Sequence, residues 1–410
     1  MEYSVTAMPV VAAIFQTQLF VSVALAVVAL ALILGATAYC IYFERKVAAW
    51  IQDRMGPSRV GPWGLFQPIA DGLKFVWKED SFPAHVDKLL FVLAPTISFV
   101  VPLVLFAAIP WGGQLDVGGG NLVEVQVANP DIGLLYILGV AALSVYGVVL
   151  GGWASRNKYS FFGGMRACAQ MLSYEIPLGL CILVVVLTMG TLRLEQITAA
   201  QTGYWLGFIP QWNVFLHPLA FVLLFICMLA ECNRAPFDLP EAEQELVGGF
   251  HTEYGALKFG MFFLGEYAHM ITSGALISVL FLGGWHLPWL AWTQPDAVSW
   301  GAALCKIVVL CAKVCFFIFV MMWIRWTLPR FRFDQLLRVA WQGLIPITLA
   351  LVAWTTGLLY FGVQRSPLWT LWGNVLILAA ALAWVARART PVTGRQDNLP
   401  PVGAGTGGAG

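Results

Sequence analysis

The sequence predicts an all-α, polytopic integral membrane protein with about nine transmembrane helices, an amphipathic helix and structured cytoplasmic loops. The nine residue types Ala, Val, Ile, Leu, Met, Phe, Trp, Tyr and Cys make up 59% of the 410 positions. Charged residues make up only 11%, far below the roughly 25% of soluble domains. Several apolar runs also reach the ~20 residues that cross a hydrocarbon core of about 30 Å. Contact with lipid therefore explains the composition.

The apolar runs place one transmembrane helical domain over residues 1–390 and leave 391–410 as a flexible Pro/Gly-rich tail. Hydropathy predicts spans near 19–43, 88–110, 131–154, 170–190, 215–233, 253–283, 302–327, 341–363 and 367–386. After the first span, the amphipathic stretch 47–54 predicts a helix in the membrane interface. Prolines and glycines between residues 56 and 68 then predict a shaped loop rather than a straight helix.

The basic residues predict the orientation. Of the 23 Lys and Arg residues, 18 fall after odd-numbered spans or in the tail, whereas Arg193 and Arg365 fall on the opposite side. The other three, Lys258, Lys306 and Lys313, lie within the proposed spans. Since cytoplasmic segments carry the excess of positive charge, we expect the N-terminus outside and the C-terminus in the cytoplasm.

Several kinds of site are disfavoured. A net charge of +1 gives no reason to expect nucleic acid as a partner. The eight cysteines form no CxxC pair, and the five histidines lack the facing pattern that two haems need. Neither GxGxxG nor a P-loop occurs. We therefore expect this chain to bind no metal and no cofactor by itself.

Five glutamates in or beside the spans are the informative feature. Glu44 is predicted to end the first span, Glu175 to open the fourth and Glu231 to end the fifth, while Glu253 and Glu266 fall in the sixth. Each costs roughly 2–3 kcal/mol at mid-bilayer. Interhelical hydrogen bonding alone is one explanation, but their number, with the acidic loop after the fifth span, favours an ion path.

On one continuous helix, Glu253 and Glu266 would differ in depth by about 20 Å. A path between them would wind through neighbouring helices, because the two side chains would point in different directions. The buried lysines 306 and 313 are either carboxylate counter-ions or protonatable relays, and the sequence leaves both roles open.

Four blocks of sequence resemble a known family. They are Glu44-Arg45-Lys46 with the run 54–74; 152–155 with 166–175; 230–247 with Glu253-Tyr254; and 329–336. In this order they resemble the family of H subunits of proton-translocating NADH:quinone oxidoreductase, respiratory complex I. The likeness covers about residues 25–360. The last span and the tail extend past the short mitochondrial form, which favours a bacterial inner membrane over a mitochondrial one.

The resemblance implies a non-redox subunit that connects the membrane and peripheral arms. The chain would form the membrane mouth of a quinone-binding chamber and couple quinone reduction to proton translocation, without a complete active site of its own. Quinone would be the substrate at the interface, while flavin and iron–sulfur clusters would lie on partner subunits. The implied partners are the 49-kDa-type subunit, the subunit with the terminal iron–sulfur cluster, small membrane-arm subunits and membrane lipids.

The resemblance also implies site residues. Those of the quinone chamber are Arg45, Trp50, Arg54, Phe259, Phe262 and Phe263. Those of proton coupling are Glu44, Asp71, Lys74, Glu175, Glu231, Arg234, Asp238, Glu241, Glu243, Glu245, Glu253 and Glu266. The aromatic residues could equally be ordinary core or lipid-facing side chains. For the arginines 45, 54, 59, 325, 330 and 332, docking of partner subunits or contact with phospholipid is the alternative.

Two other functions remain open at this stage. A related membrane-bound hydrogenase or coenzyme-driven ion pump would use an equivalent connector subunit that need not bind quinone. A self-standing ion channel or transporter is the third possibility. The type of quinone, the order of proton transfers and the role of the last span do not follow from the sequence.

Overall fold

The structure, a computed structural model, describes residues 7–117, 121–205, 207–240 and 243–387. Within these residues, eight helical segments are long and apolar enough to cross a membrane. They are α1 (Ala7–Ile51), α3 (Lys88–Leu105) with the 3-10 turn η2 (Phe106–Ala108), α4 (Gly133–Ala154), α5 (Lys158–Met189), α10 (Ala256–Phe281), α11 (Trp300–Thr327), the continuous run α12 (Phe333–Arg338), π-helical η5 (Val339–Leu344) and α13 (Ile345–Tyr360), and α14 (Pro367–Arg387). The all-α, polytopic fold is confirmed. The predicted tail 391–410 lies outside the described residues.

The connecting segments contain only short elements. These are η1 (Pro62–Gly64), α2 (Gln67–Trp77), the hairpin β1 (Gln114–Asp116) and β2 (Leu122–Glu124), α6 (Leu194–Ala200), the hairpin β3 (Tyr204–Trp205) and β4 (Ile209–Pro210), α7 (Asn213–Leu216), α8 (Pro218–Glu231), α9 (Glu243–Leu246), η3 (Gly249–His251) and η4 (Ala291–Thr293). Both hairpins are antiparallel.

The fifth predicted span is a broken helix. Its main part, α8, has 14 residues, which is about 21 Å of helix and shorter than a hydrocarbon core. The break falls at His217-Pro218, because proline cannot donate the hydrogen bond that would continue α7. Asn374 of α14 donates to the Leu216 carbonyl at 3.2 Å, which supplies a partner at the break.

The predicted interfacial helix at 47–54 is wrong. Helix α1 continues to Ile51, and the side chains of Val47, Ala48 and Ala49 are buried. No proline or glycine occurs between Gly35 and Gly56, so the backbone hydrogen bonds of α1 run on. The separate short helix is α2, which leaves Ile69, Leu73 and Val76 exposed on one face.

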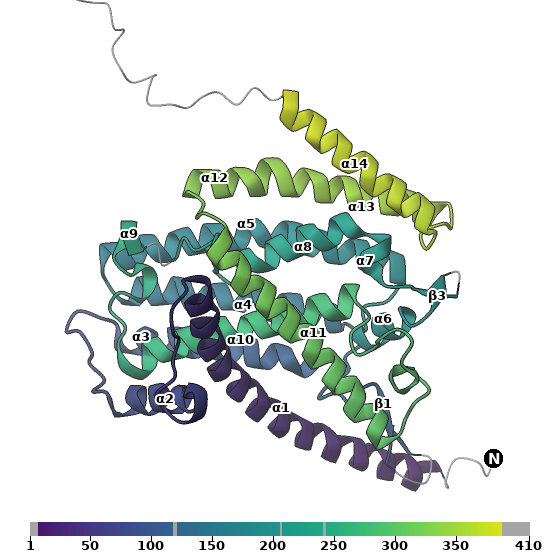
Figure 1. The fold of residues 1–410 in the computed structure, drawn as a ribbon, viewed down its shortest axis with the longest axis horizontal. Helices are drawn as coiled ribbons and strands as arrows, with labels where there is room; N and C mark the ends of the chain where they lie inside the picture. The colour runs from purple at the N-terminus through teal and green to yellow at the C-terminus, as the bar shows by residue number, and fades with distance from the viewer. Residues whose placement is uncertain (1–6, 118–120, 206, 241–242, 388–410) are drawn as a thin grey trace, which may run out of the picture.

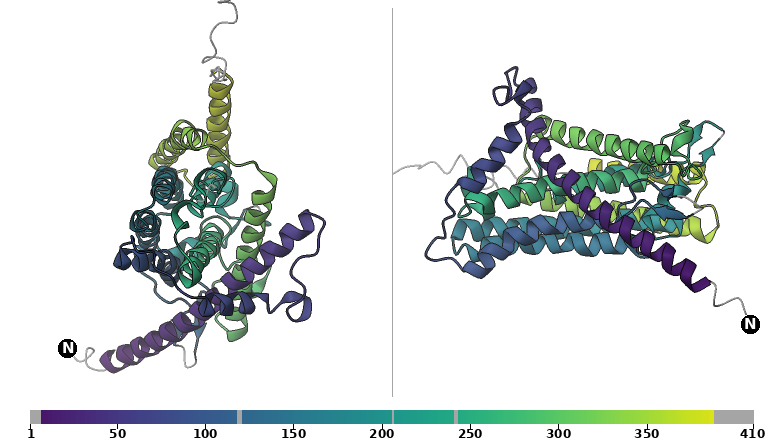
Figure 2. Two further views of the ribbon diagram at one scale, coloured as in Figure 1. Left: turned by 90° about the vertical axis from the view of Figure 1, so that its left-hand side faces the viewer. Right: turned by 90° about the horizontal axis from the view of Figure 1, so that it is seen from below.

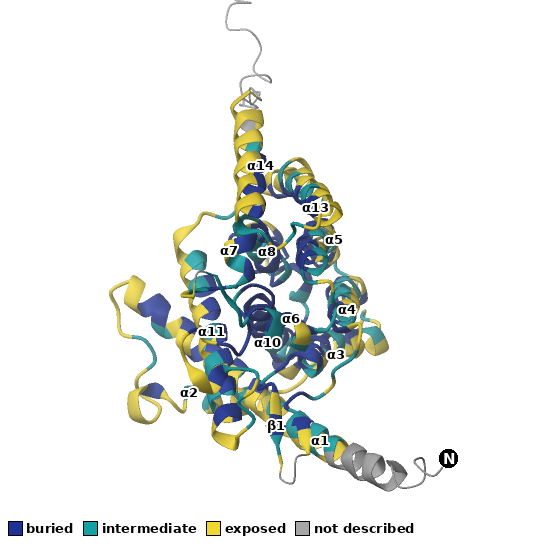
Figure 3. Ribbon diagram, turned by 90° about the vertical axis from the view of Figure 1, so that its right-hand side faces the viewer, coloured by how far each residue is buried: buried dark blue, intermediate teal, exposed yellow. Residues whose placement is uncertain are grey.

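Helix α10 forms the centre of the bundle. In its most apolar window 83% of the residues are buried, against 11% in α1. Figure 1 shows α3, α4, α5, α8 and α10 side by side, with α11 crossing them. In the end-on view, α1 and α14 lie at opposite margins (Figure 2), and buried positions concentrate on α10 (Figure 3). The side chains of α10 therefore face several helices at once.

Two glycines bring α4 and α10 against Ser98 of α3. A Cβ atom on Gly147 would lie 2.2 Å from Ser98 Oγ, and one on Gly265 would lie 2.5 Å from its carbonyl oxygen. Only glycine allows so close an approach of three helices. The packing places Glu266, the residue after Gly265, beside α3.

Lys313 binds backbone carbonyls near the end of α10. Its Nζ donates to the carbonyls of Leu282, Gly284 and His286 at 2.7, 2.8 and 2.6 Å. Lys306, two turns earlier on α11, donates to Ala297 at 2.8 Å. Both lysines thus hold the segment between α10 and α11, and Lys306 also lies near the carboxylates of Glu195 and Asp296, as expected of a counter-ion.

Candidate functional site

A charged cluster surrounds Glu44. This glutamate lies inside α1, about two turns before its end, and not at the end of the helix as predicted. Glu44 accepts hydrogen bonds from Arg234 Nη1 at 3.1 Å, from Tyr267 Oη at 2.7 Å and from Arg325 Nη1. The guanidinium of Arg234 also stacks 4.1 Å from the centre of the Tyr267 ring. Four segments far apart in sequence meet at one carboxylate.

The pairing stabilises the ionised form of Glu44. Glu44 is 6% exposed and Arg234 is 5% exposed, so little water screens the attraction between them. Two guanidinium groups and a phenol hydroxyl all favour a negative charge on the carboxylate. The cluster therefore carries one net positive charge from three charged groups, and a proton on Glu44 would weaken all three contacts.

A cavity of about 480 Å³ adjoins this cluster. Its lining residues come from α1, the following loop, α10 and α11: Ile41, Glu44, Arg45, Ala48, Ala49, Arg54, Met55, Gly56, Pro57, Phe263, Tyr267, Arg325 and Trp326. One part of the wall is apolar and the other carries arginines. Such a cavity suits a molecule with a polar head and an apolar tail.

The structure brings three of the six predicted chamber residues together at this cavity: Arg45, Arg54 and Phe263. Phe259 lies one turn away and packs on Phe263, with ring centres 5.5 Å apart. The other two lie elsewhere, because Trp50 is 69% exposed and Phe262 is buried against Phe250 and Tyr254. Consecutive residues on a helix point about 100° apart, so Phe262 and Phe263 face different sides of α10.

The predicted residues Asp71 and Lys74 both lie on α2. Asp71 forms an ion pair with Arg45 at 2.7 Å and accepts a hydrogen bond from Gln67 at 3.1 Å. Lys74 is exposed on the same helix. The ion pair fastens α2 to the end of α1 beside the cavity, so these two residues adjoin the chamber rather than the membrane carboxylates.

A second polar region lies within the bundle. One small cavity of about 40 Å³ has a largely polar group of side chains in its lining: Ser98, Ser144, Glu231, Glu266 and His269. A neighbouring cavity of about 20 Å³ is lined by Glu175, Glu231 and His269. Three of the predicted coupling glutamates are therefore brought together. Glu175 lies in the middle of α5 and does not open it, because Asn157 caps the helix much earlier.

Glu253 lies outside α10, so its predicted place within the sixth spanning helix is wrong. It is in a turn after η3 and accepts a hydrogen bond from Asn157 Nδ2 at 2.7 Å. Helix α10 starts only after Tyr254-Gly255, where the extended backbone of Gly255 forms the N-cap. The expected separation of Glu253 and Glu266 along one helix therefore does not apply.

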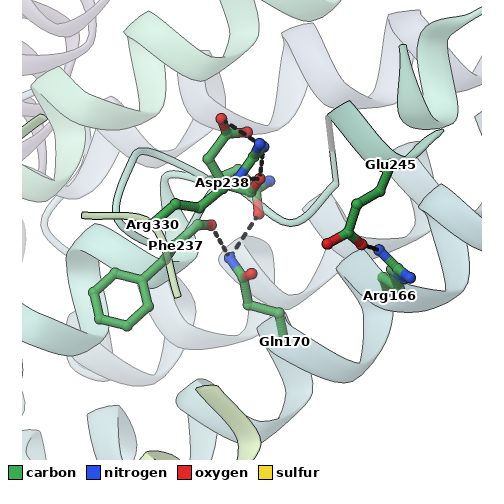
Figure 4. A network of polar contacts seen from close by, with 7 residues as sticks. Arg166, Gln170, Phe237, Asp238, Glu245 and Arg330 are labelled. Carbon is green, nitrogen blue, oxygen red and sulfur yellow. Dashed lines mark hydrogen bonds and ion pairs between the residues drawn. The ribbon is translucent and has the colours of Figure 1, made fainter. Parts of the chain in front are cut away.

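The loop after α8 is fastened to α5 and to the segment after α11 (Figure 4). Gln170 donates to the carbonyl of Phe237 at 2.7 Å, and Arg330 binds the carboxylate of Asp238 at 2.9 Å. Arg166 pairs with Glu245 at 2.5 Å. Glu243 lies in α9, whereas Glu241 lies outside the described residues.

Sequence reasoning missed several residues of the site. Tyr267 and His269 were not predicted, although both lie within one turn of Glu266. Gln170 was not assigned a role either. Arg325 and Arg330, expected to dock partners or lipid, bind the internal carboxylates of Glu44 and Asp238 instead. The described residues contain no group of three His, Cys, Asp or Glu side chains arranged to hold a metal ion.

The chain is similar to known proteins over most of its length. Residues 23–356 match the model of the family described as NADH dehydrogenase. A protein of Leptospira biflexa, named as the H subunit of NADH-quinone oxidoreductase, is 48% identical over 330 residues, which are 78% of this chain and 89% of that protein. A protein of Koribacter versatilis, named as an H subunit of the same enzyme, is 44% identical over 349 residues. The match covers 81% of this chain and 95% of that protein. Helix α14 lies beyond the residues that the family model matches.

Proposed function

This chain belongs to the NADH dehydrogenase family, and on that premise we propose that it is the membrane-arm connector subunit of NADH-quinone oxidoreductase. In this proposal it forms the membrane mouth of the quinone-binding chamber and couples quinone reduction to proton translocation. The observation that carries the proposal is the cavity beside Glu44, whose lining combines apolar side chains with arginines.

The chemistry of a quinone fits this cavity. Ala48, Ala49 and Phe263 offer apolar contacts to an isoprenoid tail. Arg45 and Arg54 offer hydrogen-bond donors to the carbonyl oxygens of the head group. The positive charge left over at Glu44 favours any negative charge that develops on the quinone during reduction.

The chain acts as a non-redox subunit in this proposal. Electrons reach the quinone from an iron–sulfur cluster on a partner subunit, and the flavin lies on another partner. The 49-kDa-type subunit and the subunit with the terminal cluster close the chamber over the segments that hold residues 52–66 and 233–255. The exposed arginines 59 and 332 remain available for docking these partners.

The proposed proton path consists of Glu175, Glu231 and Glu266, which share two adjoining cavities. Poorly hydrated carboxyl groups can gain and lose protons when nearby charge changes. Glu44 and Arg234 act instead as a fixed charged pair that holds the chamber wall. Three other acidic residues position the segment between α8 and α10 through their polar contacts, on the side that faces the peripheral arm in this proposal. They are Asp238, Glu245 and Glu253.

The quinone proposal is tested by a pair of arginine variants. Arg54→Ala removes a donor from the cavity, and a charged hydrogen bond contributes about 1.5–3 kcal/mol, so we expect the KM for quinone to rise about tenfold or more. NADH oxidation with an artificial electron acceptor should persist. Arg365→Ala, exposed in the turn between α13 and α14 and outside the cavity lining, is the matched control. Equal loss of both activities in assembled Arg54→Ala enzyme would overturn the assignment.

We place the chain in the bacterial inner membrane with the loops around residues 60, 160 and 240 in the cytoplasm. A membrane-impermeant thiol reagent should label Trp289→Cys in intact spheroplasts and Tyr159→Cys only after permeabilisation, since both positions are exposed. Wild-type protein corrects for the native cysteines. Labelling of Tyr159→Cys from outside would reverse the orientation.

A further inference from the structure

His269 is the one side chain, besides Glu231, that lines both small cavities inside the bundle. It follows Glu266 by one turn of α10 and is only 7% exposed. Its Nε2 lies 3.3 Å from Glu231 Oε1, without the alignment of a hydrogen bond. Neither ring nitrogen has a hydrogen-bond partner among the described residues. Burying an imidazole without hydrogen-bond partners costs free energy, so a ring kept in this state calls for a functional explanation.

The two cavities have different polar linings. The larger holds Glu266, Ser98 and Ser144, and both serine hydroxyls are buried without a partner in the described chain. The smaller holds Glu175, Thr272 and Ser273. With about 40 and 20 Å³, each has room for a water molecule and offers it polar partners. His269 and Glu231 form the boundary between them.

Charges of one sign face this boundary. The titratable groups that line the two cavities with His269 are Glu231 and Cys232 at the end of α8, Glu175 on α5, and Glu266 on α10 itself. Neither lining includes a lysine or arginine side chain of the described chain. Positive charge on the imidazole would therefore be balanced by carboxylates on three helices.

We propose that His269 carries protons between the two cavities, as the link that joins Glu231 to the water on either side. This inference rests on the proposed function and adds a residue to its proton path. An imidazole can accept a proton at one nitrogen and release one from the other, and these two atoms lie on opposite sides of the ring.

The transfer step is balanced. The O–H bond of protonated Glu231 breaks as an Nε2–H bond forms, which leaves a carboxylate beside an imidazolium. The Nδ1–H bond then breaks, and its proton passes to water, from which Glu175 or Glu266 takes it up. The neutral ring then carries its proton on Nε2 and regains the Nδ1–H tautomer by exchanging protons with water.

His269→Gln tests the proposal, because glutamine keeps hydrogen bonding but does not titrate. In the assembled complex we expect quinone-dependent turnover to fall about tenfold or more, and its pH profile to lose the step that the imidazole contributes. NADH oxidation with an artificial acceptor should not change. His217→Gln is the matched control, since His217 is also buried but pairs with Thr188 at 2.9 Å and lines neither cavity.

Two outcomes overturn the inference. The first is a His269→Gln complex with normal turnover and an unchanged pH profile. The second is a loss of turnover with an unchanged pH profile, which would show that the ring only packs. If His269→Gln does not assemble, His269→Asn is assessed by the same two measurements. If the His269→Gln enzyme is normal and the Glu266→Gln enzyme is inactive, only the role of His269 is refuted. If both enzymes are fully active, the proposed proton path is refuted as well.

Discussion

Replacing Glu44 with glutamine is expected to lower quinone-dependent turnover of the assembled enzyme by more than tenfold and to destabilise the chain by about 3–5 kcal/mol. The variant leaves the buried guanidinium of Arg234 and the half-buried guanidinium of Arg325 without their carboxylate, because both arginines bind Glu44. Thermal unfolding in mild detergent and NADH:quinone activity measure the two effects. Asp334→Asn is the matched control, since that carboxylate pairs with Arg332 only at the exposed surface, at 3.6 Å.

The double variant Glu44→Gln with Arg325→Gln separates charge pairing from packing. It restores the net charge of the cluster to that of the natural chain, so we expect part of the lost stability to return. Residues in one polar network are coupled, and their effects do not add. Additive losses of stability would contradict the view that Glu44 serves as a fixed anion between two arginines.

Glu266→Gln is expected to abolish most turnover and proton pumping together. Glutamine keeps the volume and most of the hydrogen bonding of glutamate but cannot ionise. Tight coupling then stalls electron transfer to quinone, while NADH oxidation with an artificial acceptor continues. The measurements are initial rate, proton-to-electron ratio and subunit content of the purified complex.

The control for Glu266 is a glutamate outside the lining of both small cavities. Glu124 on β2 is half-buried and accepts a hydrogen bond from Asn129 at 2.9 Å. Glu124→Gln should leave the proton-to-electron ratio unchanged. A fully assembled Glu266→Gln enzyme with normal turnover and ratio would remove that glutamate from the path.

The fold class, the order of the spans and the family all followed from the order of the amino acids. Hydropathy is a property of short stretches of chain, so apolar runs such as 131–154 and 302–327 could be placed almost to the residue. The motif strings around Glu44, Glu231 and Arg330 predicted the family that the comparisons then matched. These inferences needed no knowledge of which helices touch.

Local sequence was less informative where a helix breaks or continues. The run 47–54 is amphipathic and followed by prolines, yet it ends α1 because nothing interrupts the backbone hydrogen bonds there. Glu253 directly precedes a largely apolar run, yet the extended Gly255 starts α10 after it. Both errors came from reading composition where the path of the backbone decides.

Which charges are paired became clear only from the packing of the helices. Glu44 meets Arg234 and Arg325 across 190 and 281 residues of sequence, and Phe263 reaches the cavity while its neighbour Phe262 does not. His269 faces Glu231 because α8 and α10 pack together, although nothing in its local sequence marks it. The physical reason is that a buried side chain takes its charge state and role from groups within a few ångströms, and in a helical bundle most of those groups come from other helices.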